Sequence, residues 1–272
     1  MTQQDIDASE APLIEHLIEL RTRLIYSVLG FIVAFAVSFY FSSDILHLLI
    51  LPFKWATGQD VSLISIKLLG VFLVKLKIAF FGGLFIGFPL IATQIYRFVA
   101  PGLYSHEKQA FLPYLIATPV FFLMGAALVY FFLLPVAIHF FYALAAGTET
   151  DGAGIQLMPD IEAYLDFVMM LILAFGLCFQ LPVILTLLGQ IGVLSYDQLK
   201  SGRKFAIVGV FIVAAILTPP DPISQVSMAV PLMLLYEISV QAVRLLEYRR
   251  KKREAAREAS DSTAVVPGKD PS

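Results

Sequence analysis

Long runs of apolar residues alternate with short polar stretches along most of the 272-residue chain. Six apolar runs lie near residues 24–42, 72–96, 110–136, 163–189, 205–217 and 223–243. A helix needs roughly 20 apolar residues to cross the hydrocarbon core of a bilayer. The fifth run, with about 13 residues at about 1.5 Å each, reaches only roughly 20 Å. The pattern therefore predicts an all-α polytopic membrane protein with six transmembrane helices, the last two of them short.

Basic residues are distributed unevenly between the predicted loops. The N-terminal segment, the second and fourth loops and the tail hold 15 of the 19 lysines and arginines, whereas the third loop, roughly 137–162, holds none. By the positive-inside rule, both termini are expected in the cytoplasm, which agrees with an even number of spans. We therefore expect the chain to have three parts. They are a cytoplasmic segment with an amphipathic helix (1–23), the six-helix transmembrane domain (24–246), and a basic, then disordered, cytoplasmic tail (247–272).

The composition excludes several classes of protein. With 58% hydrophobic and 15% charged residues, the chain is far more apolar than a soluble domain, and its net charge of −2 does not favour nucleic acid binding. One cysteine, Cys178, allows no intramolecular disulfide, and the four histidines are too scattered for a metal site. Motifs of hydrolases and of phosphate-binding loops are absent. We therefore expect no enzyme activity, no cofactor and no metal.

Within the membrane, the polar residue that stands out is Gln180, in the middle of the fourth run. A glutamine can form hydrogen bonds but carries no proton, so this position favours a polar contact between helices over a proton relay.

Acidic residues mark two stretches that the charge pattern places on the cytoplasmic side. In the N-terminal segment, Glu19 and Arg23 have the spacing of a favourable helical pair, and taken alone this segment favours a solvated helix face over a binding site. Leucines 13, 17, 20 and 24 recur at helical spacing and would lie on lipid or on neighbouring helices. The second loop adds Glu107 among aromatic residues. Two carboxylates on one membrane face would suit a cationic peptide.

Five stretches of the chain, in order, resemble the TatC family, the multispanning subunits of the twin-arginine protein translocase. They are His16–Leu24 (HLIELRTRL), Phe98–Glu107 (FVAPGLYSHE), Phe175–Pro182 (FGLCFQLP), Leu217–Asp221 with Ser224–Gln225, and Pro231–Glu237. The resemblance covers about residues 12–247.

The resemblance implies a role for individual residues. Glu19 and Glu107 would bind the paired arginines of a signal peptide, a task for which bidentate carboxylate–guanidinium geometry is suited. Arg21 would order this acidic site and Phe98 would form its apolar edge. Gln180, where family members carry Glu or Gln, would contact a partner subunit within the membrane. Two more residues match family positions outside the cytoplasmic site and would be structural: Pro52 and Asp221.

The resemblance also implies partners and a location. The chain would lie in the cytoplasmic (inner) membrane of a prokaryote and bind twin-arginine signal peptides of folded cargo. It would self-associate in a multimeric receptor complex and organise TatA-like and TatB-like single-span subunits for export driven by the proton-motive force. The alternative, from another class, is a secondary transporter for a small solute. A third class, an intramembrane hydrolase, is disfavoured because the sequence shows no nucleophile–base pair.

Overall fold

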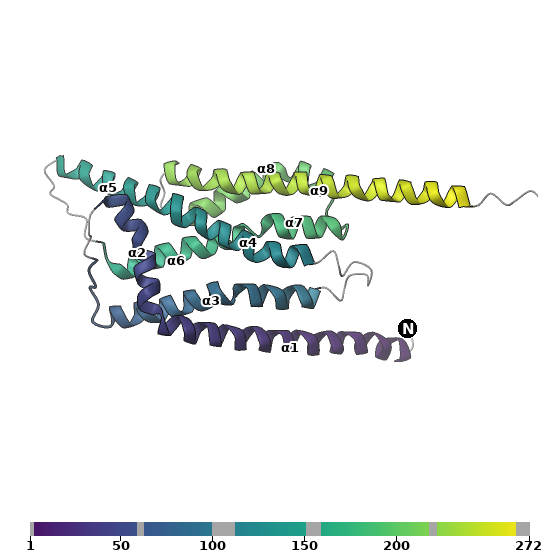
Figure 1. Ribbon diagram of the computed structural model, residues 1–272, viewed down its shortest axis with the longest axis horizontal. Helices are drawn as coiled ribbons and strands as arrows, with labels where there is room; N and C mark the ends of the chain where they lie inside the picture. Colours follow the sequence, from purple (N-terminus) through teal and green to yellow (C-terminus); the bar gives the residue numbers. More distant parts are fainter. Residues whose placement is uncertain (1–2, 59–62, 100–111, 151–158, 218–221, 265–272) are drawn as a thin grey trace, which may run out of the picture. The chain divides into compact units, whose positions relative to one another are not determined.

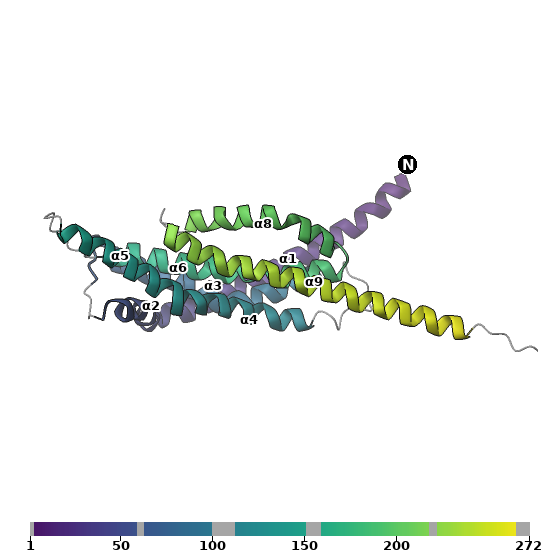
Figure 2. The same cartoon turned by 90° about the horizontal axis from the view of Figure 1, so that it is seen from above.

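The computed structural model describes residues 3–58, 63–99, 112–150, 159–217 and 222–264, and its elements there are helical (Figures 1 and 2). In chain order they are α1 (Gln3–Tyr40), α2 (Ser42–Thr57), α3 (Gly70–Val99), α4 (Leu112–Leu128), η3 (Val129–Leu133), α5 (Leu134–Thr150), α6 (Ile161–Cys178), α7 (Leu181–Gln190), α8 (Tyr196–Leu217) and α9 (Pro222–Ala264). The chain divides into two compact units, Met1–Cys178 and Phe179–Ser272.

In the first unit, α1 and α3 lie side by side along much of their length (Figure 1). Glycines make this close approach possible: a Cβ atom on Gly83 would lie 3.0 Å from the Cα atom of Phe35, and one on Gly82 would lie 2.7 Å from Oγ of Ser38. Small residues at helix interfaces are how membrane helices gain packing, because burial of apolar groups drives little association in lipid. Gly82 and Gly83 of the second apolar run therefore serve helix packing.

A π-helix, η3, joins α4 and α5 into one continuous helical segment (Figure 1). Its wider turn is closed by the amide of Leu134, which donates to the carbonyl of Val129 five residues earlier. Pro135 follows directly and has no amide hydrogen to donate to Phe131, so the regular α-helical pattern cannot continue through this turn. The prolines of the third run thus modify the helix without ending it.

In the second unit, α8 and α9 run side by side (Figure 2), and α7 also packs on α9. Leu199, Val240 and Val243 form its buried apolar cluster. A Cβ on Gly189 would lie 2.8 Å from a methyl group of Val243, so the glycine lets α7 approach α9 closely. The turn between α7 and α8 contains Gly192 with φ of +79°, a backbone conformation that residues with a Cβ rarely adopt.

Among the described residues, five helical segments are long and apolar enough to cross a membrane: Ile14–Tyr40, Gly70–Phe98, Pro113–Leu144, Ile161–Gln190 and Gln225–Lys252. The short fifth run of the sequence forms the second part of α8, whose first part carries Lys200, Arg203 and Lys204. Helix α9 continues from its apolar part through the basic stretch to Ala264, a region whose composition had indicated disorder after the basic run.

Candidate functional site

The candidate site lies where the N-terminal part of α1 meets the C-terminal end of α3. The rings of His16 on α1 and Phe98 on α3 are stacked, with centroids 4.3 Å apart and planes inclined by 20°. Glu19 follows His16 by three residues and therefore lies on the same face of α1, one turn further along. The stack thus brings the part of α1 that carries Glu19 to the end of α3, directly before the second loop.

The carboxylate of Glu19 is only partly committed to a partner within the chain. Its Oε1 accepts one hydrogen bond of 3.2 Å from Nη2 of Arg23, four residues along the helix, and both side chains are close to 30% exposed. Nε of Arg23 is buried and has no hydrogen-bond partner among the described residues. A single contact of this length is weaker than a bidentate pair. Glu19 can therefore accept a second guanidinium group.

Of the other residues expected at this site, Arg21 and Phe98 are described and Glu107 lies outside the described residues. Arg21 is exposed, and the arginine that contacts Glu19 is Arg23. Phe98 is half-buried against His16, as an apolar edge requires. His16 adds a residue to the predicted site; its helical spacing from Glu19 is the sequence signal for it.

The exposed face of α1 matches the leucine stripe of the sequence. Leu17 and Leu24 are 61% and 60% exposed, and Ile14 and Ile18 beside them are also exposed. In a membrane, such a face contacts lipid or another helix.

Gln180 and Pro52 are both buried, and Asp221 lies outside the described residues. Gln180 directly precedes α7, and its carbonyl oxygen accepts the amide of Ile184 at 2.9 Å.

Pro52 lies inside α2 and has no amide hydrogen to donate to Leu48, four residues earlier. The hydroxyl of Tyr130 donates to that carbonyl instead, at 2.7 Å. Pro52 thus leaves the Leu48 carbonyl free to accept the hydrogen bond that joins α2 to the π-helix carrying Tyr130.

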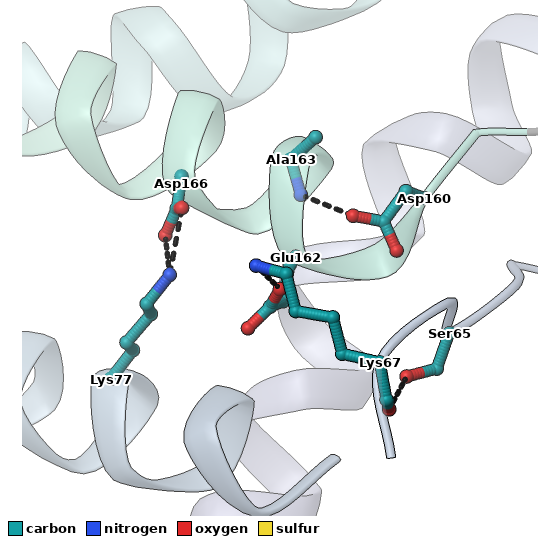
Figure 3. A network of polar contacts seen from close by, with 7 residues as sticks. All are labelled: Ser65, Lys67, Lys77, Asp160, Glu162, Ala163 and Asp166. Carbon is teal, nitrogen blue, oxygen red and sulfur yellow. Dashed lines mark hydrogen bonds and ion pairs between the residues drawn. The ribbon is translucent and has the colours of Figure 1, made fainter. Parts of the chain in front are cut away.

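A second polar cluster lies at the opposite end of α3, where α3 and α6 begin (Figure 3). Nζ of Lys67 contacts Oε2 of Glu162 at 2.6 Å, and Nζ of Lys77 contacts both carboxylate oxygens of Asp166 at 2.9 and 2.8 Å. Asp160 caps α6 by accepting the amide of Ala163 at 3.2 Å. Lys67 and Lys77 are among the four basic residues outside the predicted cytoplasmic parts of the chain, and the structure pairs each of them with an acidic residue of the first two turns of α6.

The two partners of the Lys67–Glu162 ion pair differ in how deeply they are buried. The side chain of Glu162 is only 6% exposed, and its Oε1 has no hydrogen-bond partner among the described residues, whereas Lys67 is largely exposed. The hydrogen bond and the charge of Glu162 raise the pKa of the Lys67 amino group above its usual range. The pair holds the segment just before α3 to the start of α6.

Beside the second ion pair, α3 and α6 enclose an open groove of about 450 Å³. Its lining is apolar except for Lys77 and Asp166: Leu76, Phe80, Phe81, Met169, Met170 and Leu173. In the part of the chain that the structure describes, no group of three or more His, Cys, Asp or Glu residues is placed to hold a metal ion.

The helices, their apolar lengths and the charged clusters at both ends of α3 together define an all-helical protein that spans a membrane several times. Comparison with known proteins identifies the family. Residues 15–231 match the family model described as Sec-independent protein translocase protein (TatC). This chain belongs to the TatC family.

Individual relatives agree. The protein TatC of Magnetococcus marinus is 45% identical over 250 residues, covering 92% of this chain and 90% of the relative. TatC of Escherichia coli K12 is 37% identical over 243 residues, with 89% and 92% covered. A crystal structure described as the twin arginine translocase receptor TatC superposes with a TM-score of 0.74 at 37% identity, covering 85% of this chain and 99% of that one.

These comparisons confirm the predicted family and the predicted class, an all-α polytopic membrane protein of protein transport. Membership in a family of translocase subunits also confirms that the chain is a transport protein and not an enzyme. The roles assigned to Glu19, Arg21, Phe98, Glu107 and Gln180 remain predictions.

Proposed function

We propose that this protein is the signal-peptide receptor of a twin-arginine translocase and binds the arginine pair of folded cargo with Glu19 and Glu107. The observation that carries the proposal is the stacking of His16 on Phe98, because it brings the Glu19 turn of α1 to the end of α3 that leads into the loop with Glu107. The printed description of the similar crystal structure, a twin arginine translocase receptor, supports the same function.

The chemistry of the site fits a guanidinium ligand. Glu19 holds Arg23 by one 3.2 Å contact, so an incoming arginine can replace this contact with a bidentate one at little cost. Phe98, stacked on His16 one helical turn from Glu19, offers an aromatic surface on which a guanidinium or an apolar peptide side chain would pack. Arg21, exposed on α1, would order the acidic loop residues, including Glu107.

A photo-cross-linking experiment tests this proposal. A benzophenone side chain at position 98 should cross-link to a twin-arginine signal peptide, and an excess of unlabelled twin-arginine peptide should suppress the product more strongly than a twin-lysine peptide does. The control is the same group at Val71, which is exposed near the other end of α3. Equal cross-linking at both positions, or equal competition by both peptides, would contradict the assignment of the site.

The proposed orientation has both termini in the cytoplasm, with the end of α5 and the loop after it on the outside. A cysteine at Thr150, the last residue of α5, tests this in a Cys178→Ala background. We expect labelling of intact cells by a membrane-impermeant maleimide from the external side. Labelling that requires cell lysis would reverse the orientation.

We also propose that the protein works in an assembly in the cytoplasmic membrane. Single-span TatA-like and TatB-like subunits would bind to exposed apolar helix faces, with Gln180 as one intramembrane contact, and several copies would form the receptor complex. Export would use the proton-motive force. The exposed apolar face of α1 supports helix-to-helix association of this kind.

A further inference from the structure

The polar end of the second unit, where α8 begins and the apolar part of α9 ends, has an excess of cations close to one aromatic ring. Nζ of Lys200 lies 5.9 Å from the centroid of the Tyr196 ring, and the guanidinium carbon of Arg244 lies 5.5 Å from the same centroid. Lys200 is on α8 and Arg244 is on α9. Two positive charges from different helices therefore converge on one ring.

Two of the three described carboxylates at this end, those of Glu237 and Glu247, already accept hydrogen bonds; the third, Asp197, lies in the first turn of α8. Oε1 of Glu237 accepts hydrogen bonds from Nη2 of Arg203 at 2.6 Å and from Nε2 of Gln241 at 2.8 Å. Oε1 of Glu247 accepts the amide of Tyr196 at 2.7 Å. Within the described ranges, neither Lys200 nor Arg244 has a carboxylate partner at ion-pair distance.

More cations surround this pair. Lys204 lies over the ring of Phe205, with Nζ 5.1 Å from the centroid. A guanidinium nitrogen of Arg250 lies 3.5 Å from the position that a Cβ on Gly192 would take, at the turn before α8. The charge excess is thus a property of the folded end of the unit, built by α8, α9 and the turn that joins α7 to α8.

The apolar side chains beside these cations indicate the chemical class of their ligand. Lys200 and Lys204 lie in the charged first part of α8, before its apolar part, and Arg244 lies on α9 shortly before the basic run that begins at Arg249. All three therefore adjoin the apolar parts of their helices at the end of the unit that carries the basic residues. Exposed apolar side chains adjoin them: Phe205 is 71% exposed and Leu245 is 50% exposed. A ligand that carries a negative group and an apolar chain side by side matches this arrangement.

We propose that this end of the second unit binds the phosphodiester headgroup of an anionic phospholipid, with Lys200 and Arg244 as its principal cations. The aromatic ring of Tyr196 fixes the two cationic side chains by cation–π contact, so little side-chain freedom is lost on binding. Phe205 and Leu245 contact the acyl chains. Such a site is independent of the signal-peptide site, whose residues all lie in the first unit.

Native mass spectrometry of the purified full-length protein, titrated with dioleoylphosphatidylglycerol or dioleoylphosphatidylcholine, tests the site. The wild type should bind the anionic lipid more tightly than the zwitterionic one. Lys200→Gln/Arg244→Gln should weaken phosphatidylglycerol binding roughly thirtyfold, about 2 kcal/mol for two cations near an anionic group, and leave phosphatidylcholine binding unchanged.

The matched control is Lys251→Gln/Lys252→Gln, which removes the same charge further along α9. It should change the affinity for phosphatidylglycerol less than threefold, because charges further from the bound headgroup contribute less. A charge-preserving swap, Lys200→Arg/Arg244→Lys, should retain binding and shows that the loss in the Gln variant is not a loss of folding.

Three results would overturn the proposal: equal losses in the two double Gln variants, unchanged phosphatidylglycerol binding in Lys200→Gln/Arg244→Gln, or displacement of the lipid by millimolar inorganic phosphate. The first would indicate a diffuse electrostatic attraction. The second would leave the cations for another partner, such as an acidic protein segment. The third would indicate a site for free anions.

Discussion

The hydroxyl of Tyr130 donates a 2.7 Å hydrogen bond to the carbonyl oxygen of Leu48. That carbonyl has no helix donor of its own, because Pro52 stands four residues further on. The bond therefore satisfies a backbone group and joins α2 to the π-helix at one point.

We predict that Tyr130→Phe lowers the free energy of unfolding by about 1 kcal/mol, since it leaves the Leu48 carbonyl without a donor. In a Pro52→Ala background, the restored amide can bond Leu48, so the same change should cost less than half as much. Tyr164→Phe is the matched control: its hydroxyl bonds the carbonyl of Leu49, whose helix donor Phe53 is intact. Thermal unfolding in detergent measures all four variants; equal costs of Tyr130→Phe in both backgrounds would refute the explanation.

Gly83→Ala should destabilise the packing of α1 on α3 by about 1–3 kcal/mol, because its Cβ would meet the backbone of Phe35 at 3.0 Å. Gly87→Ala is the control on the same helix. Its Cβ would find its nearest neighbours at 3.8 Å, an ordinary contact, so the better helix propensity of alanine should make this change neutral or stabilising. Melting temperatures in detergent that fall equally for both variants would show that Gly83 has no special role in packing.

Lys77 and Asp166 should show energetic coupling in a double-mutant cycle. Lys77→Met leaves the Asp166 carboxylate without its cation, and Asp166→Leu leaves the lysine without its anion, whereas the double variant leaves no charge. We expect the double variant to be more stable than either single variant, with a coupling of about 1 kcal/mol. Lys75→Met, at a lysine with no ion-pair partner among the described residues, should combine additively with Asp166→Leu.

Glu19→Gln and Glu107→Gln should each weaken binding of a twin-arginine signal peptide by about 2–5 kcal/mol, the range for truncating one partner of a desolvated charge pair. Glu15→Gln, one turn before Glu19, should bind nearly as the wild type does. Fluorescence anisotropy with a labelled peptide measures the affinity, and the amount of protein in the membrane shows whether the variants accumulate. Wild-type affinity in both site variants would rule out the acidic site.

Gln180→Leu should slow export and weaken subunit assembly while leaving signal-peptide affinity unchanged, because the buried amide would be lost and the acidic site kept. The expected loss is about 0.6–2 kcal/mol, as for intramembrane hydrogen bonds. Gln180→Glu should remain active if a hydrogen-bonding group is sufficient. Export rates of the wild type, the Leu variant and the Glu variant, measured side by side, distinguish a hydrogen-bonding role from proton exchange at position 180. An inactive wild type together with an active Glu variant would indicate proton exchange.

Much of the fold could be predicted from hydrophobic pattern alone, because lipid requires each span to satisfy its own backbone and so to be a helix. The apolar lengths therefore located the spans. The ends of helices were harder to predict. Helix α8 begins at Tyr196, well before its apolar part, because the charged first half packs on α9 through contacts such as Arg203 with Glu237.

The contacts that position side chains could not be predicted from spacing. Lys67 and Glu162 are 95 positions apart, and the stack of His16 on Phe98 joins two different helices. Such contacts depend on which helix faces meet, and one sequence contains no information on pairing between distant segments. The pair Glu19 and Arg23 could be predicted because one helical turn determines its geometry.

Helix α9 runs from Pro222 to Ala264 as 43 consecutive helical residues. At about 1.5 Å per residue its length is about 64 Å, roughly twice the hydrocarbon thickness of a bilayer. A tilt of about 10° inside the membrane would displace the end of a protruding part about 30 Å long by roughly 5 Å. As long as the helix stays straight, small tilts of its apolar part would therefore become larger displacements at Ala264.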